Sequence, residues 1–162
     1  MKKLVLVSLA LVLSFNVIAQ TEGIGIGAIL GTTVDFTAKF WMSEKTALVA
    51  SVGFDWGGYG GIHMNVDYLI HNWTFDVGQD MLKVYFGPGV AVGLATGYAS
   101  YYWDTYSYSR FRFTVRAPGG IGYYFHSMPL ECFAEIVPGV DITGPYGFNF
   151  RWDSYVGARW YF

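Results

Sequence analysis

Residues 148–162 read Phe-Asn-Phe-Arg-Trp-Asp-Ser-Tyr-Val-Gly-Ala-Arg-Trp-Tyr-Phe. The even-numbered positions are apolar except for one serine, whereas the odd-numbered positions carry every charge in the stretch. Successive side chains of a β-strand point to opposite faces, so the alternation predicts a strand with one apolar and one charged face. Residues 110–125 show the same alternation in the opposite phase, with Phe111, Phe113 and Val115 set between arginines.

Segments of this kind follow one another along the chain from Gly23 onward, separated by turn-forming residues. A strand that crosses a membrane needs about 9–11 residues, and each segment reaches that length. The pattern therefore predicts an all-β fold, an eight-stranded antiparallel up-and-down transmembrane β-barrel. The eight predicted strands are residues 22–31, 33–42, 46–56, 62–72, 81–95, 110–125, 130–142 and 148–162.

The composition supports a membrane barrel over a soluble domain. The chain of 162 residues is 53% hydrophobic, 20% aromatic and 14% charged, whereas a soluble domain carries about 25% charged residues. Beyond the N-terminal region, no run approaches the roughly 20 apolar residues of a transmembrane helix. A barrel reconciles a high apolar content with the lack of such a run.

The N-terminus predicts export. Lys2 and Lys3 precede the apolar run Leu4 to Val12, and Ala19 ends a small-residue cleavage site. We therefore expect a signal peptide over residues 1–19 and a barrel domain over residues 20–162. Removing the two lysines leaves 8 basic and 12 acidic residues, a balance that argues against a nucleic-acid partner. Cys132 is the single cysteine, so no intramolecular disulfide can form.

The alternation assigns the charges within the predicted strands to the lumen face. The interior of an eight-stranded barrel is just wide enough for side chains to fill it, and buried charges must be paired there. We therefore expect a packed network of ion pairs that plugs the lumen. The predicted lumen charges are Asp35, Lys39, Asp55, Asp67, Lys83, Arg110, Arg112, Arg116, Glu131, Glu135, Asp141, Arg151, Asp153 and Arg159.

Small residues and prolines refine this prediction. Glycines that share the lumen face are expected to make room for Trp41, Tyr85, Tyr155 and the arginines. Pro88 and Pro138 fall on the outward face, and proline cannot donate to a ladder, so we expect bulges or kinks at both.

The chain resembles small outer-membrane barrels of the OmpA and OmpX type. The terminal Trp160-Tyr161-Phe162, with Trp160 and Phe162 on one face, is similar to the C-terminal aromatic signal of such proteins. Stretches such as residues 38–47 and 66–71 are similar to a family of short exported barrels without assigned activity. The resemblance implies the outer membrane of a Gram-negative-type bacterium, outer-membrane lipid and the assembly machinery as partners, and a monomer.

No residue pattern predicts chemistry, so we expect no enzyme, catalytic residue, metal or cofactor. His63, Asp67 and His71 share the lumen face, but a spacing of four residues along a strand is about 13 Å, too far for a common metal. Ser154 faces outward, and no general base lies beside it in the sequence.

The segment 98–109 is the longest predicted outward loop and is rich in tyrosine and serine. Such a composition favours adaptable recognition surfaces; an aromatic girdle at the membrane interface is the alternative. The candidate recognition residues are Tyr101, Tyr102, Trp103, Asp104, Tyr106 and Tyr108.

The predicted function is a non-enzymatic barrel with a structural or surface-interaction role and a possible extracellular ligand. A small-solute channel is the first alternative. A soluble ligand-binding barrel of the lipocalin type is the second, and it would place apolar residues inside and charges outside.

Overall fold

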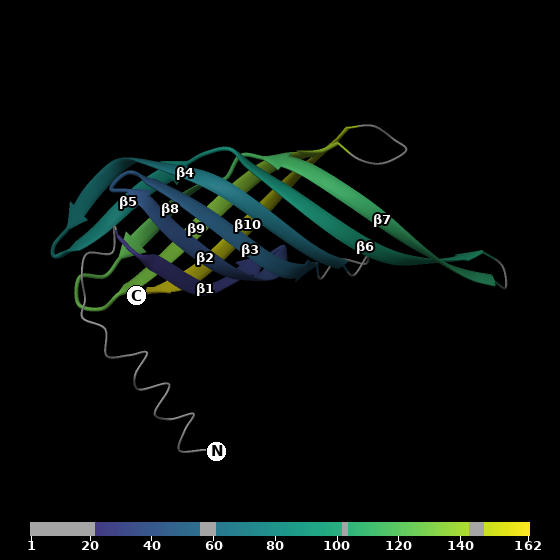
Figure 1. Cartoon of the computed structure of the whole chain (residues 1–162), viewed down its shortest axis with the longest axis horizontal. Helices are drawn as coiled ribbons and strands as arrows, with labels where there is room; N and C mark the ends of the chain where they lie inside the picture. Colours follow the sequence, from purple (N-terminus) through teal and green to yellow (C-terminus); the bar gives the residue numbers. More distant parts are fainter. Residues whose placement is uncertain (1–21, 56–60, 102–103, 143–147) are drawn as a thin grey trace, which may run out of the picture.

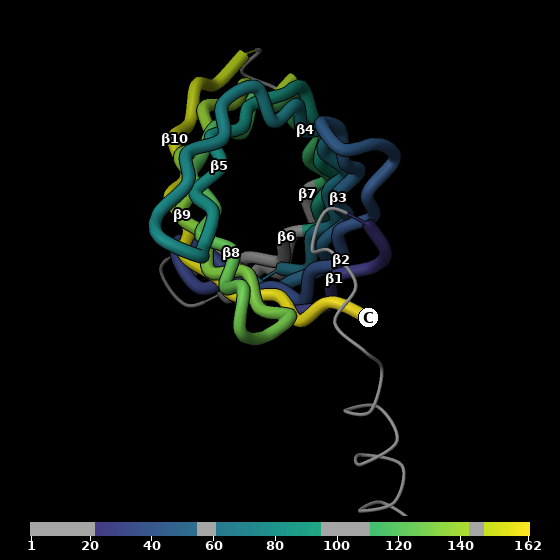
Figure 2. The backbone as a smooth tube through the Cα atoms, turned by 90° about the vertical axis from the view of Figure 1, so that its left-hand side faces the viewer, coloured from purple at the N-terminus to yellow at the C-terminus, as the bar shows by residue number. Residues whose placement is uncertain are grey.

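The computed structural model describes residues 22–55, 61–101, 104–142 and 148–162. Its ten strand segments form one antiparallel sheet that closes on itself (Figures 1 and 2). The predicted signal peptide lies outside the described residues. The strands are β1 Ile24–Gly31, β2 Thr33–Ser43, β3 Thr46–Asp55, β4 Gly61–Val77, β5 Asp80–Phe86, β6 Gly89–Tyr101, β7 Asp104–Arg116, β8 Gly119–Tyr124, β9 Leu130–Asp141 and β10 Asn149–Tyr161.

These segments make eight barrel strands, as the sequence predicts. β5 and β6 both pair with β4 and are two parts of one strand, and β7 and β8 both pair with β9 in the same way. β1 pairs with β10 from Gly25↔Tyr161 to Gly31↔Tyr155, which closes the ring. Figure 2 shows this ring from one end. No helix within the described residues is long and apolar enough to cross a membrane.

The two faces of the barrel differ as the alternation predicts. Large apolar side chains on every barrel strand are exposed on the outside, and the charged side chains lie inside. This arrangement contradicts the lipocalin-like alternative, which requires the reverse. Exposed outward residues include Ile26, Phe36, Val52, Phe54, Met64, Val66, Phe86, Val90, Leu94, Phe111, Val115, Ile121, Ile136, Phe150, Trp152 and Val156.

Prolines interrupt the sheet along one line that crosses three neighbouring barrel strands. The carbonyls of Pro88, Pro118 and Pro138 accept hydrogen bonds from the amides of Tyr68, Gly87 and Ala117 respectively. The line therefore follows three X-Pro-Gly triplets in the sequence, residues 87–89, 117–119 and 137–139. At Pro88 β5 ends and β6 begins, but both pair with β4 in one continuous register, from Ile70↔Phe86 to Asp67↔Gly89, so the predicted bulge is absent there.

At Pro138 the prediction of a bulge or kink is wrong. β9 runs through Pro138, which pairs with Trp152 without a change of register. On its other side β9 passes from β8 at Ile136 to β7 at Gly139. Pro138 thus lies opposite the gap between those two strands, and its missing amide leaves no ladder bond unmade.

Two further differences concern strand length. β4 continues to Val77 because it stays paired with β5 as far as Val77↔Asp80. A bulge between His71 and Trp73 shifts the register by one residue, so Trp73, Phe75 and Val77 are exposed on the outer side. The predicted loop 98–109 is wrong as a loop, because β6 and β7 continue as a hairpin paired as far as Tyr101↔Asp104. Its alternating tyrosines, serines and threonines favour extended backbone.

The lumen glycines provide the space that the large interior side chains need. A Cβ at Gly53 would meet the carboxylate of Asp35 and the backbone of Val34. A Cβ at Gly157 would meet the ring of Phe133, and one at Gly25 the ring of Tyr161. A Cβ at Gly93, by contrast, would make only ordinary contacts of 3.5 Å or more.

We predict that Gly53→Ala lowers the free energy of unfolding by about 1–3 kcal/mol because it overpacks the lumen. Gly93→Ala is the matched control: Gly53 and Gly93 flank His63 in register on the two neighbouring strands. Because its methyl group fits, it should leave stability unchanged or raise it by up to about 1 kcal/mol. Equilibrium unfolding in denaturant measures both, and equal effects would contradict the steric assignment.

Candidate functional site

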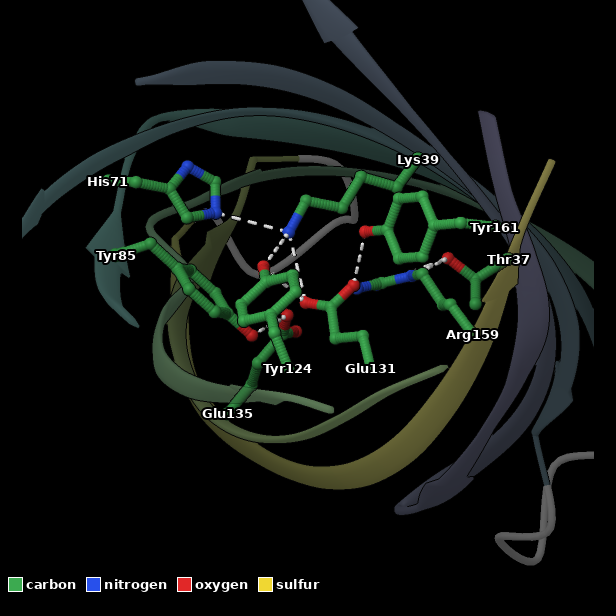
Figure 3. Close-up of polar contacts among 9 residues, drawn as sticks. All are labelled: Thr37, Lys39, His71, Tyr85, Tyr124, Glu131, Glu135, Arg159 and Tyr161. Carbon is green, nitrogen blue, oxygen red and sulfur yellow. Dashed lines mark hydrogen bonds and ion pairs between the residues drawn. The ribbon is translucent and has the colours of Figure 1, made fainter. Parts of the chain in front are cut away.

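A buried carboxylate, Glu131, lies at the centre of the lumen (Figure 3). Its Oε1 accepts hydrogen bonds from Lys39 Nζ at 3.0 Å and Tyr124 Oη at 2.8 Å. Its Oε2 accepts from Tyr161 Oη at 2.5 Å and from Arg159 Nη1 at 3.4 Å. Two cations and two hydroxyls therefore satisfy one carboxylate that has no solvent exposure.

The ammonium of Lys39 is also surrounded by hydrogen-bond partners. Besides Glu131, it donates to Tyr124 Oη at 2.7 Å and lies 3.1 Å from His71 Nε2. The ammonium also lies 4.5 Å from the ring centroid of Trp41. Aromatic faces stabilise a desolvated cation. The nitrogen of His71, the carboxylate of Glu131 and the aromatic rings therefore take the place of water around the lysine.

Arg159 connects this centre to the barrel wall. Its guanidinium donates to Thr37 Oγ1 from Nε and Nη2, both at 3.3 Å, and lies 3.8 Å from the ring centroid of Phe133. Glu135 accepts a separate hydrogen bond from Tyr85 Oη at 2.7 Å. We call Thr37, Lys39, His71, Tyr85, Tyr124, Glu131, Glu135, Arg159 and Tyr161 the central network.

Local sequence explains how six segments meet at this centre. The residues of the central network come from β2, β4, β5, β8, β9 and β10, and strand alternation turns each of them inward. Gly122 on β8 lies beside Tyr124 and Glu131, where a Cβ would be 3.0 Å from Glu131 Oε1. The alternation supplies the direction of each side chain, and the glycine supplies the room.

Toward the ends of the barrel strands that carry the long connections, the lumen holds separate ion pairs. His63 Nε2 lies 3.1 Å from Asp35 Oδ2, and Arg116 Nε lies 3.1 Å from Asp67 Oδ1. Arg151 Nη2 donates to Asp153 Oδ1 at 2.7 Å. These pairs adjoin a cavity of about 20 Å³, lined by Thr33, His63, Ala91, Val92, Arg112, Thr114, Arg116, Arg151, Asp153 and Tyr155.

This part of the lumen is less completely satisfied than the central network. Ser51 Oγ, His63 Nδ1 and Asn65 Oδ1 are buried without a hydrogen-bond partner in the protein. Buried polar atoms of this kind are normally satisfied by water, and the cavity volume fits about one molecule. The lumen therefore has a centre in which Lys39, Glu131 and Arg159 are bonded within the protein, and a second region suited to hydration.

Of the fourteen predicted lumen charges, the structure describes the side chains of twelve: nine are buried, and Arg112, Asp141 and Arg151 are half-buried. Glu131 forms ion pairs with both Lys39 and Arg159. Asp67 pairs with Arg116, and Asp153 pairs with Arg151. Asp35 lies beside His63. Lys83 Nζ lies 4.9 Å from the ring centroid of Trp41.

Sequence reasoning missed the tyrosines that complete the centre. Tyr124 and Tyr161 share lumen parity with Arg116 and Arg159, so the alternation contained the signal. Their hydroxyl groups were overlooked because attention to charge alone does not reveal neutral donors. Within the described residues, no group of three or more histidine, cysteine or carboxylate side chains could hold a metal ion.

Of the candidate recognition residues, Tyr101, Asp104, Tyr106 and Tyr108 lie on the hairpin of β6 and β7, which projects beyond the other strands (Figure 1). Within the described residues, β6 pairs with β4 as far as Ala95, and β7 with β9 as far as Thr114. Beyond these points the two strands pair with each other, with Tyr108 opposite Gly97 and Tyr106 opposite Ala99. Tyr102 and Trp103 lie outside the described residues.

The residues of the predicted assembly signal end the last barrel strand. Trp160 pairs with Ile26 on one side and Leu130 on the other. The amide of Phe162 donates to the carbonyl of Ile24 at 3.0 Å, and its side chain is half-exposed on the outer surface. Cys132 is exposed as well.

Comparison with solved structures identifies the fold. The chain is similar to the N-terminal β-barrel domain of OprF from Pseudomonas aeruginosa, with a TM-score of 0.59, 18% identity, and coverage of 86% of this chain and 95% of that one. Ail, the attachment invasion locus protein of Yersinia pestis, aligns with a TM-score of 0.33 and 10% identity over 86% of this chain and 94% of its own. No protein-family model and no curated protein sequence matches.

We predict that Glu131→Gln lowers the free energy of unfolding by about 3–5 kcal/mol, because it leaves Lys39 and Arg159 buried without a counter-charge. Glu44→Gln, at an exposed turn, is the control and should change little. The double variant K39M/E131Q should recover part of the loss, because it removes one of the uncompensated charges. Denaturant unfolding measures all three, and a loss no larger than that of the control would contradict the central network.

Proposed function

We propose that this chain is a non-enzymatic barrel of the outer membrane of a Gram-negative-type bacterium, with a structural or surface-interaction role. The carrying observation is the division of the barrel into an outside with exposed apolar side chains on all eight barrel strands and an inside that holds the buried charged side chains. Such an outside is costly in water and favourable in lipid. The OmpA and OmpX-like fold supports the same environment.

The partners follow from the same geometry. The exposed apolar belt fits outer-membrane lipid, and the terminal Trp160 and Phe162 fit recognition by the assembly machinery. Closure of β1 on β10 leaves neither end strand of the sheet in need of a second copy, which favours a monomer. The negative balance of the chain gives no basis for nucleic-acid binding.

A non-enzymatic role is supported by the surroundings of the outward nucleophile. Ser154 lies on the outer face of β10, opposite Ile136 of β9 and between the exposed Trp152 and Val156 on its own strand. None of these three neighbours can act as a general base, which a serine nucleophile requires. The buried carboxylates instead bind lumen cations and hydroxyls.

The lumen is proposed to be plugged. The central network spans the interior from β2 to β9 and β10, with Lys39, Glu131 and Arg159 at most 1% exposed. An ion passing this point would have to break several charge-assisted hydrogen bonds at once. This arrangement favours the plugged barrel over a small-solute channel.

Planar-bilayer recording tests the plug. We expect the reconstituted protein to give no stable, ohmic conductance of porin size, because an ion would have to break the charge-assisted hydrogen bonds of the central network. Long-lived, well-resolved channels of that size in the purified, heat-modifiable protein would favour the small-solute channel.

The projecting hairpin is the proposed recognition surface for an extracellular ligand, centred on Tyr101, Tyr102, Trp103, Asp104, Tyr106 and Tyr108. Its backbone lies beyond the barrel ladder, so its residues contribute to the ring only through their own pairing. Connecting segments that project from a rigid scaffold commonly carry function. Tyrosines supply large contact area at a low entropic cost.

Replacing residues 98–107 by a short Gly-Ser turn should leave folding and heat-modifiability intact, because these strand residues pair with each other and not with β4 or β9. The replacement should abolish adhesion of cells displaying the barrel to polypeptide-coated or polysaccharide-coated surfaces. A variant with Tyr101, Tyr106 and Tyr108 changed to serine keeps the hairpin and should lose adhesion as well. Adhesion that survives both changes would locate recognition elsewhere; a truncated chain that fails to fold would assign the aromatics to the barrel rim.

A further inference from the structure

The outer surface of β1 to β4 and β6 contains a groove of about 500 Å³. Its floor is a row of residues in direct register across these strands: Ile26↔Ala38, Ala38↔Ala50, Ala50↔Val66 and Val66↔Val90. The two alanines at the centre of the row carry less side-chain bulk than the outward residues in the rows on either side. The volume lies within the range of small-molecule sites.

Larger side chains border this floor on both sides. On the side toward the long connections, the adjacent outward row is Phe36↔Val52, Val52↔Met64 and Met64↔Val92, and Phe36 is 70% exposed. On the side toward the chain ends, the next row is Phe40↔Leu48 and Leu48↔Tyr68. The groove therefore runs across the strands between two rows of larger side chains.

The chemistry of the groove selects an aliphatic occupant. Its outward side chains are those of alanine, valine, isoleucine, methionine and phenylalanine, and none of them can donate a hydrogen bond. The backbone groups of its floor are used in the barrel ladder. A methylene chain lying between two rows gains van der Waals contact on both sides, whereas a convex surface offers contact on one side only.

The position of the groove along the membrane normal determines which part of a lipid would enter it. Ala38 and Ala50 lie near the middle of β2 and β3, so in a membrane-spanning barrel they fall near the bilayer midplane. Head groups do not reach this depth, but the ends of acyl chains do. A second copy of the chain is disfavoured, because protein interfaces in membranes rely on small and polar residues, and this face offers two alanines among bulky side chains.

We propose that this groove is a binding site for the terminal half of a lipid acyl chain, which it holds in an ordered position against Ala38 and Ala50. The proposal rests on the membrane location proposed above. It adds to that location a specific acyl-chain site on one side of the barrel.

The test fills the groove. A38L/A50L adds bulk to its floor; A134L/A158L adds the same bulk to outward positions of β9 and β10, away from the groove. Each protein is reconstituted into phosphatidylcholine vesicles containing a small fraction of lipid with a nitroxide near the acyl-chain end, and the motionally restricted fraction is measured by electron paramagnetic resonance. A second label near the head group serves as a depth control.

We expect A38L/A50L to lower the restricted fraction of the chain-end label relative to the unmodified protein, and A134L/A158L to leave it unchanged. The head-group label should not distinguish the proteins. Equal restricted fractions in all three proteins would overturn the proposal, as would an equal loss in both variants. Cross-linked dimers that only A38L/A50L abolishes would assign the groove to a second copy. Failure of the unmodified protein to insert into vesicles would instead contradict the membrane location.

Discussion

The closure of β1 on β10 is the constraint on which the rest of the structure depends. It uses the hydrogen-bonding groups of both end strands, and it fixes a ring of eight barrel strands whose interior is filled by side chains. Alternation then divides every strand between two environments. Charged groups directed into so narrow a space cannot be hydrated individually, so each must find a partner. Glu131 illustrates this pairing, because it accepts hydrogen bonds from two cations and two tyrosine hydroxyls.

Close packing inside the ring explains features of the sequence that charge alone does not. Several lumen glycines occur where a tyrosine, a phenylalanine or a carboxylate from a neighbouring strand occupies the space that a Cβ would need. The positions of the prolines are also related to one another. Pro88, Pro118 and Pro138 lie along one line, so that the interruptions of neighbouring ladders coincide and the carbonyl of each proline is still used.

The sequence was sufficient to predict the fold class, the strand count and the inward position of the charge network, because one period-two signal controls all three. The sequence was insufficient to predict which lumen residues contact one another. Alternation states that Lys39 and Glu131 face inward, but the register between strands far apart in sequence decides that they meet. The extension of β6 and β7 and the bulge after His71 were missed because both depend on pairing geometry. Pro118 was overlooked although the three X-Pro-Gly triplets were visible.

Cell fractionation combined with a heat-modifiability gel tests the central claim, a closed barrel whose apolar face lies in the outer membrane. The full-length chain is expressed in a Gram-negative host, and the protein is followed with and without boiling in detergent. The account predicts that it sediments with the outer membrane and migrates faster unheated than boiled, because a closed hydrogen-bonded ring resists unfolding by detergent. Recovery in the soluble periplasm, with the same mobility before and after boiling, would contradict it.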